Sequence, residues 1–251
     1  MGVPSMYDLS YYTAFRDGSR KSAQVIVPLV VDWVAPASIL DLGCGVGEWL
    51  SVFQEAGVPE IHGVDGDHVC REQLAISERE FTAHDLTTPY PAGGRYDLAI
   101  SLEVGEHLPA ESSPCLVHSL ADAAPLVLFS AAIPNQPGKS HINCQWAAYW
   151  ADLFAEHGYV VIDSLRLRLW NDSRVDWWYR QNIMIYACEK ELGRWLKLKA
   201  LRAPELRRPL PGVHPEMFQQ VLEWGVEWEK KYWEAWEQQH SRHKAGQTLL
   251  P

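Results

Sequence analysis

The sequence of 251 residues has little cysteine, no long apolar run and no excess of basic charge. Its five cysteines are scattered, odd in number and free of C-x-x-C spacing, so they indicate neither a disulfide framework nor a zinc site. No run of 18 apolar residues occurs, and the N-terminus lacks the apolar core of a signal peptide. We therefore expect a cytoplasmic protein without a membrane partner.

Acidic residues outnumber basic ones by 32 to 22, which gives a net charge of −10. A phosphate backbone is held by clustered Lys and Arg, so this balance argues against a nucleic-acid partner. The hydrophobic fraction of 47% and the charged fraction of 22% are typical of a globular chain. We expect one large α/β domain with terminal additions.

A glycine-rich stretch, ILDLGCGVGEW at residues 39–49, is the feature around which the rest is organised. It has the pattern of a buried strand followed by a tight turn into a helix, where Gly43, Gly45 and Gly47 would let a ligand lie against the backbone. The dinucleotide fingerprint G-x-G-x-x-G has its third glycine one residue later than this sequence does. Asp41, two residues before the first glycine, suits an ammonium group better than a pyrophosphate.

The pattern D-x-G-x-G-x-G resembles motif I of the class I S-adenosylmethionine-dependent methyltransferases, although a glycine turn of another Rossmann-like protein is the alternative. The resemblance implies a doubly wound seven-stranded α/β sheet that binds S-adenosylmethionine. It implies that Asp65, which ends the next strand, binds the ribose, and that Asp85 and Leu86 contact the adenine. The implied donor-binding residues are Asp41, Gly43, Cys44, Gly45, Gly47, Asp65, Gly66, Asp85, Leu86, Leu102 and Glu103.

Three segments are expected along the chain: an N-terminal helical segment (1–35), the catalytic domain (36–190) and a helical C-terminal extension (191–251). Strands are predicted at 39–42, 60–65, 81–86, 96–103, 125–130, 159–168 and 177–187. Helices are predicted at 23–34, 48–56, 67–76, 109–124, 145–157 and 216–240, with Pro28 starting or kinking the first.

Aromatic residues recur every fourth position in the last predicted helix, at Trp224, Trp228, Tyr232 and Trp236. This spacing puts them on one helix face. The face is expected to pack on the catalytic domain or on a second subunit of a homodimer. The alternative is an aromatic cap over a substrate.

The acceptor side of the site is predicted where the fourth and fifth strands end, because open α/β sheets bind ligands at that edge. The segment SLEVGEHLP supplies Glu103, Glu106 and His107, and the linker 131–143 supplies His141. We assign Glu106, His107 and His141 as catalytic residues. Tyr12 and Trp49 are further candidates for the pocket wall.

The spacing E-x-x-E-H resembles the metal site of the small-RNA 2′-O-methyltransferases and the motif of the ubiquinone-pathway O-methyltransferases. That resemblance implies a divalent cation (Mg, Mn or Fe) on Glu103, Glu106, His107 and His141. The alternatives are a metal-free general base at His107 and a structural role.

Together these features predict an S-adenosylmethionine-dependent methyltransferase acting on an oxygen of a hydroxylated small-molecule acceptor, such as a sugar or a natural-product intermediate. An N- or C-methyltransferase is the first alternative. A catalytically silent S-adenosylmethionine-binding subunit, docked to a partner through its Trp-rich helix, is the second.

Overall fold

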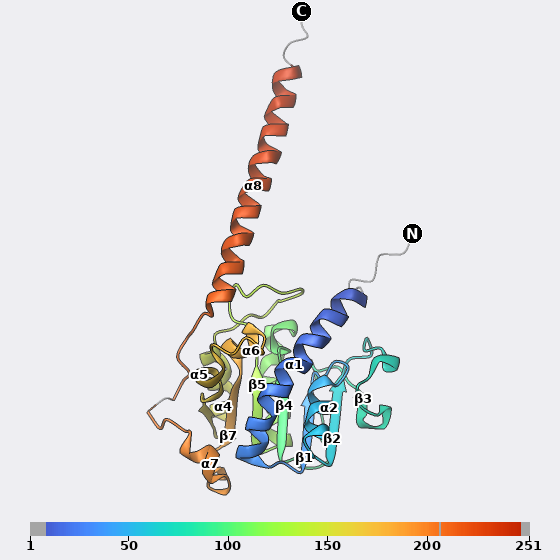
Figure 1. The fold of residues 1–251 in the computed structure, drawn as a ribbon, viewed down its shortest axis with the longest axis vertical. Helices are drawn as coiled ribbons and strands as arrows, with labels where there is room; N and C mark the ends of the chain where they lie inside the picture. Colours follow the sequence, from blue (N-terminus) through green and yellow to red (C-terminus); the bar gives the residue numbers. More distant parts are fainter. Residues whose placement is uncertain (1–8, 206, 247–251) are drawn as a thin grey trace, which may run out of the picture.

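The computed structural model describes residues 9–205 and 207–246, with side chains for 18–205 and 207–234. Its centre is a seven-stranded sheet in the order β3-β2-β1-β4-β5-β7-β6 (Figure 1). All neighbouring strands are parallel except β7, which runs antiparallel to β5 and β6. The predicted fold class is confirmed. The strands are β1 (Ser38–Leu42), β2 (Glu60–Asp65), β3 (Phe81–Ala83), β4 (Leu98–Leu102), β5 (Leu126–Ser130), β6 (Tyr159–Ile162) and β7 (Met184–Cys188).

Two helical layers cover the sheet, and each encloses its own apolar core. The central strands β4 and β5 are buried at every residue, as expected of parallel strands covered on both faces. One core lies under α1 (Leu9–Val34), α2 (Glu48–Glu55) and α7 (Leu196–Ala200), and the other under α3 (Ser113–Ala123) and α4 (Ala147–Glu156). The remaining helices are α5 (Leu165–Leu169), α6 (Trp177–Asn182), α8 (Pro215–Gly246) and the 3-10 helices η1 (Arg71–Gln73), η2 (Glu78–Glu80), η3 (Gly105–His107), η4 (Ala110–Ser112) and η5 (Leu192–Arg194).

The N-terminal helix α1 is continuous for 26 residues and packs on α2. Pro28 lies inside it and does not start it. Ile26, Val27 and Val30 are fully buried, which places one face of α1 in the core. Arg20 donates from Nη1 to Glu48 (3.2 Å), so α1 is also tied to the helix that follows the glycine turn.

Three predicted elements are wrong. The helix expected at 67–76 is an irregular segment around η1, held down because Ala75 N donates to Val46 O (2.7 Å). The strand expected at 159–168 stops at Ile162 and continues into α5. The strand expected at 177–187 begins as α6 and becomes β7 only at Met184.

The strands predicted at 159–168 and 177–187 were wrong for the same reason, because buried residues form a short helix in each segment. Leu165 and Leu169 are one helical turn apart and both are buried, and Arg166 pairs with Asp163 at i,i+3, a helical spacing. In α6, residues Tyr179–Asn182 are all buried. The segment therefore lacks the alternation of an apolar and a polar face by which a helix is recognised in a sequence. The antiparallel end of the sheet is present, but two short helices connect its strands.

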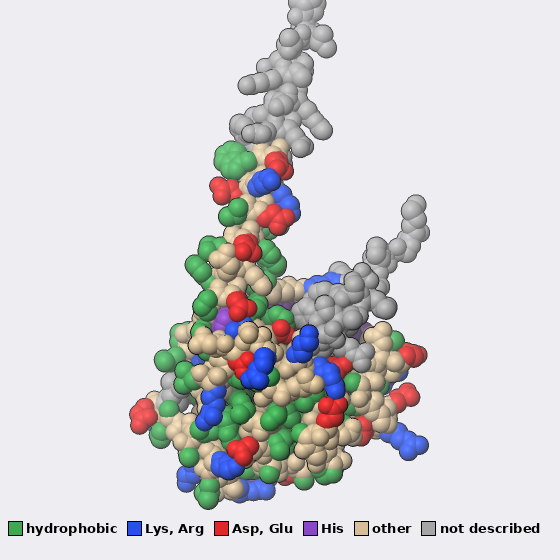
Figure 2. All heavy atoms as spheres, in the orientation of Figure 1, with side chains coloured by type: hydrophobic (Ala, Val, Ile, Leu, Met, Phe, Trp, Pro, Cys, Tyr) green, Lys and Arg blue, Asp and Glu red, His purple; other side chains and the backbone are tan. Residues whose placement is uncertain are grey.

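The C-terminal helix α8 projects from the domain (Figure 1). Its first turn is anchored, because Met217 packs with Ile133 and Trp177. Beyond that turn, Trp224, Trp228 and Tyr232 are 52%, 73% and 62% exposed. Figure 2 shows hydrophobic side chains along this projecting part.

The prediction that this aromatic face packs on the catalytic domain is therefore wrong for these three residues, because the helix leads away from the sheet. The side chain of Trp236 lies outside the described residues. Packing on a second subunit and capping of a substrate stay predictions. Over the part of the chain that the structure describes, no helix is long and apolar enough to cross a membrane.

Candidate active site

The glycine turn after β1 has a backbone conformation that only glycine adopts readily. Gly43, Gly45 and Gly47 have positive φ angles of 93°, 54° and 85°. A Cβ on Gly43 would lie 2.3 Å from the side chain of Val104, and one on Gly47 would lie 2.9 Å from Ile76. The turn therefore brings bare backbone to the carboxyl edge of the sheet, as a bound cofactor requires.

Two aspartates flank this turn, one hydrogen-bonded to backbone amides and the other buried with a raised pKa. Asp65, at the end of β2, accepts from Gly45 N and Gly66 N, both at 2.7 Å, so it holds the turn against the second strand. Asp41 is buried, and burial followed by the charge of Asp65 raises its pKa well above the ordinary value. Burial also raises the pKa of the Cys44 thiol, which keeps it protonated.

The residues assigned to the adenine lie beyond β3. Asp85 is exposed, and its Oδ1 accepts from the amide and the hydroxyl of Thr87 (2.9 and 2.7 Å), which lowers its pKa. Leu86 is buried in the core under α3 and α4. Because β3 runs parallel to β2, both residues follow the strand end that lies beside Asp65. Their assignment to the adenine stays a prediction.

Trp49 is a buried side chain of α2. It is 6% exposed, and its Nε1 donates to the hydroxyl of Tyr179 (3.3 Å). That hydroxyl also lies 3.2 Å from Ser19 Oγ of α1. Trp49 therefore links α2 to α6 and α1. The side chain of Tyr12, the other residue proposed for the pocket wall, lies outside the described residues.

The turn after β4 separates the two glutamates of the E-x-x-E-H motif. Leu102 is buried at the end of the strand, and Glu103 has a positive φ of 56°. The carboxylate of Glu103 accepts from Asn182 Nδ2 (3.1 Å) and Gln136 Nε2 (2.9 Å). Burial raises the pKa of Glu103 and these amides oppose that rise, so Glu103 is the better stabilised anion of the pair.

Glu106 lies in η3 and is fully buried. Neither of its carboxylate oxygens has a hydrogen-bond partner of good geometry in the part of the chain that the structure describes, and the carboxyl lies close to that of Glu103. Burial, and then the charge of Glu103, raise its pKa well above the ordinary value. A buried carboxyl in this state requires either a proton or a cation.

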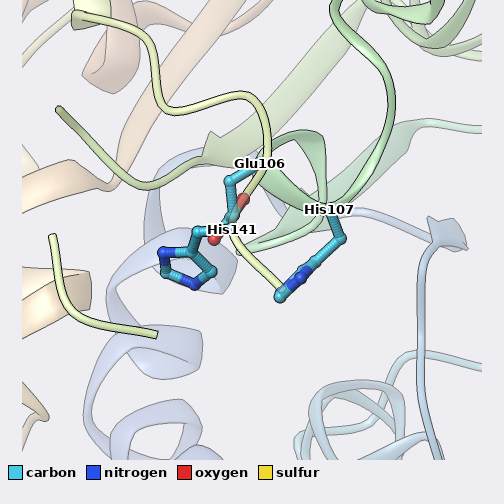
Figure 3. Close-up of side chains that lie close together, drawn as sticks. All are labelled: Glu106, His107 and His141. Carbon is cyan, nitrogen blue, oxygen red and sulfur yellow. The ribbon is translucent and has the colours of Figure 1, made fainter. Parts of the chain in front are cut away.

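His107 and His141 complete a cluster with Glu106. One possible ligand atom from each of the three lies within 4.8 Å of the others, and Figure 3 shows the side chains converging from the turn after β4 and the loop after β5. Glu103 is not in this cluster. The structure thus brings together three of the four predicted ligands, and the fourth is held by amides.

Each imidazole has one nitrogen at a backbone carbonyl. His107 Nδ1 lies 3.3 Å from Ser140 O, and His141 Nδ1 lies 3.2 Å from Gln136 O. A carbonyl only accepts, so Nδ1 carries the hydrogen and Nε2 keeps its lone pair. Burial lowers the pKa of both histidines, which favours this neutral form. Backbone partners on Nδ1 are the usual support of a metal-binding imidazole.

The loop after β5 is clamped to the turn after β4. Ile142 N and Asn143 N both donate to Glu106 O (2.9 and 3.1 Å), and Asn143 Nδ2 donates to Gly105 O (3.1 Å). Gly138 lies against the imidazole of His141, where a Cβ would be 2.0 Å from Nε2. Only glycine leaves room for the ring at this position.

Sequence reasoning singled out the linker 131–143 but assigned no role to the individual residues that support the cluster, namely Gln136, Gly138, Asn143, Gln181 and Asn182. The only signal was the polar run R-Q-N at 180–182, which stands out in an otherwise apolar stretch. Gln181 donates to Gln136 (3.1 Å) and accepts from His214 N (2.7 Å), so these amides join Glu103 to the base of α8.

Comparison with known proteins agrees with this architecture. A model of the methyltransferase domain family matches residues 20–197. No curated protein matches the chain. The fold is shared with an O-methyltransferase family protein from Burkholderia thailandensis at 15% identity and a TM-score of 0.52, over 72% of this chain but only 60% of that one. Magnesium protoporphyrin IX methyltransferase from Synechocystis PCC 6803, solved with bound SAH, has 19% identity and a TM-score of 0.51 over 74% of this chain and 90% of its own.

Identities this low show a common fold and say nothing about the acceptor. The family match is more specific, because it spans both the glycine turn and the Glu106–His107–His141 cluster. The chain belongs to the methyltransferase domain family.

Proposed function

We propose that the protein transfers the methyl group of S-adenosylmethionine to a hydroxyl oxygen of a small molecule. The donor half of the site supports this cofactor in three ways. The glycine turn exposes backbone where the methionine end would lie, Asp41 would face its ammonium group, and Asp65 ends β2 where a ribose-binding carboxylate is expected.

The observation that carries an oxygen acceptor is the state of Glu106. Its buried carboxyl has no hydrogen-bond partner of good geometry in the described chain and lies beside two imidazoles. Their Nδ1 atoms face backbone carbonyls, which leaves Nε2 as the accepting nitrogen. An uncharged amine has a lone pair ready for methyl transfer, whereas a hydroxyl is a weak nucleophile until its proton is removed or its pKa is lowered. This cluster is suited to that task.

Glu106, His107 and His141 would hold one divalent cation, and a bound cation lowers the pKa of a coordinated hydroxyl. One carboxylate and two imidazoles suit Mn, Fe or Mg better than a closed zinc site. Glu103 would stay with Asn182 and Gln136 and add negative charge nearby. Without a cation, Nε2 of His107 is the atom that would accept the hydroxyl proton.

The acceptor is proposed to be neutral or basic, with an apolar or ring-shaped body. The chain has a net charge of −10, and Ile142 and Trp146, which follow His141 in the chain, are 64% and 44% exposed. Flat aromatic surfaces bind sugars and ring systems. We propose a sugar or natural-product intermediate in the cytoplasm, and a homodimer through α8.

Calorimetry with S-adenosylmethionine and with NAD tests the donor. We expect binding of the first alone, and binding of NAD alone would overturn the assignment. A methyl-transfer assay on a panel of hydroxylated sugars and phenols, with matching amines, tests the acceptor atom. Transfer to amines only would overturn oxygen as the acceptor.

The cation is tested by exhaustive chelation followed by addition of Mn²⁺, in the wild type and in His141→Ala. We expect activity to be lost and then restored only in the wild type. His118→Ala, an exposed histidine outside the cluster, is the control and should behave as the wild type. Full activity after chelation would leave His107 as the base.

A further inference from the structure

The projecting part of α8 carries exposed aromatic residues on one face. Trp224, Trp228 and Tyr232 are 52%, 73% and 62% exposed, and their recurrence at every fourth residue places them along one side of the helix. Figure 2 shows hydrophobic side chains along this part of the helix. Single exposed apolar residues are ordinary, whereas a row of large ones marks an interaction surface. The face therefore indicates a partner.

The residues at the centre of this face have the spacing of a coiled-coil seam. Gly225, Trp228, Tyr232 and Ala235 follow one another at intervals of three, four and three residues, which is the pattern by which two helices pair. We call these four residues the α8 seam. Their order is small, aromatic, aromatic, small, so the seam is symmetric about residue 230.

This symmetry fits an antiparallel pair of two copies of α8. With a twofold axis at residue 230, Trp228 of one copy lies level with Tyr232 of the other, and Gly225 lies level with Ala235. Aromatic rings then meet aromatic rings at the centre, and the small residues let the two backbones approach on either side. A parallel pair would also match each residue type with itself, so the orientation is decided by charge.

The charges of α8 are divided between its two halves. Residues 216–229 include four glutamates and no Lys or Arg, whereas residues 230–246 include four Lys or Arg and two glutamates. A parallel pair would place the two acidic halves side by side. An antiparallel pair places each acidic half against the basic half of the other copy, and complementary charge of this kind selects one orientation of an interface.

The antiparallel orientation also keeps the two domains apart. Each domain is attached at the first turn of α8, where Met217 packs with Ile133 and Trp177. In the antiparallel pair the two copies of residue 217 are 26 positions apart along the helices, which is about 40 Å at 1.5 Å per residue. Each chain has a net charge of −10, and repulsion over such a distance is screened by salt.

We propose that the partner of α8 is a second copy of this chain, bound antiparallel along the α8 seam with the twofold axis at residue 230. The proposal rests on the homodimer proposed above and adds its orientation and register. It depends on neither the methyl acceptor nor the cation. In this arrangement the last turn of each α8 reaches the first turn of the other copy, where Ile133 belongs to the loop that carries His141.

Cysteine cross-linking of the full chain tests the register. In the antiparallel pair residue 225 lies level with residue 235 of the other copy, whereas the two copies of residue 225 are about 15 Å apart, too far for a disulfide. Under mild oxidation we expect covalent dimers of the double variant Gly225→Cys/Ala235→Cys and none of either single variant. A Cβ on Gly225 meets no atom within 4 Å. The wild type is the control, because none of its five cysteines lies in α8.

Light scattering after size-exclusion chromatography tests the dimer itself. Trp228→Ala should weaken dimerisation at least about tenfold, because a central tryptophan is the kind of residue that dominates an interface. Leu167→Ala, which truncates an exposed side chain of α5, should change nothing. A monomeric wild type, covalent dimers of the single cysteine variants, or no covalent dimer of the double variant would each overturn the proposal. Methyl transfer by such a protein would leave the proposed function standing.

Discussion

The two halves of the site hold their acidic residues by different means. In the donor half, Asp65 accepts from Gly45 and Gly66, which are 20 residues and one residue away in the chain. In the acceptor half, Glu103 accepts from Asn182, 79 residues away, and His141 lies in a loop that is clamped to the turn of Glu106. The donor half is local in sequence, and the acceptor half is assembled from three distant segments.

The two halves also differ in how a central carboxyl group is hydrogen-bonded. Backbone amides satisfy Asp65, whereas Glu106 has no hydrogen-bond partner of good geometry in the described chain. A buried carboxyl that is left unpaired has a position for a proton or a cation. The following predictions are ordered from the largest expected effect to the smallest.

Glu106→Gln keeps the shape of the side chain and removes its charge. We expect methyl transfer to fall by at least about 100-fold, since general acid–base or cation assistance is lost. Binding of S-adenosylhomocysteine should be unchanged, because Glu106 lies in the acceptor half. Weakened cofactor binding in calorimetry would contradict the separation of the two halves.

Asp65→Ala acts on the donor half alone. Loss of the carboxylate should weaken S-adenosylmethionine binding by about 1–3 kcal/mol, the range for a hydrogen bond to a charged group. The variant should fold, although Gly45 N and Gly66 N lose their acceptor. Unchanged affinity in a folded variant would show that Asp65 supports the turn without touching the ligand.

Gly138→Ala tests the packing of His141 without changing any polar group. The new Cβ would lie 2.0 Å from Nε2, so the imidazole must move. We expect Mn²⁺ affinity and activity to fall about 10–100-fold, as for other changes in the support of a metal ligand. Gly94→Ala is the matched control, because a Cβ there meets no atom within 4 Å.

The pH dependence of stability reports on Glu106 directly. Its pKa is raised in the folded state, so its stabilising contribution is complete below the unfolded pKa of about 4.3 and is lost as pH rises toward the folded value. Between about pH 5 and pH 8 the melting temperature of the wild type should fall more than that of Glu106→Gln. Mn²⁺ at pH 8 should reverse the loss in the wild type only, and equal pH profiles would mean that folding does not raise the pKa of Glu106.

Removal of residues 226–251 should have the smallest effect on the domain. The anchoring residue Met217 is kept, and the deleted part of α8 includes Val226 and Trp228, which are 67% and 73% exposed. Stability should change by about 0.5 kcal/mol or less, as for other surface changes. Size-exclusion chromatography tests the subunit contact: a shift from dimer to monomer would support it, and an unchanged elution volume would contradict it.

The sequence by itself determined the parts of the protein that depend on neighbours in the chain. The strand and helix around the glycine turn follow from apolar runs and from glycines that alone tolerate positive φ angles at Gly43, Gly45 and Gly47. The seven-stranded doubly wound sheet was implied by the resemblance to the class I methyltransferases, and the structure confirms it. The meeting of Glu106, His107 and His141 at one edge also follows, because β4 and β5 are parallel neighbours.

Only the tertiary structure decided what each side chain does there. Glu103 leaves the cluster because amides of Gln136 and Asn182 reach it from other elements, and no local pattern announces such partners. The short helices α5 and α6 form because buried contacts override the strand-like composition of these segments. The aromatic face of α8 projects because helical spacing shows which residues share a face but not what that face meets. Contacts between distant segments are created by folding, so residue spacing alone cannot encode them.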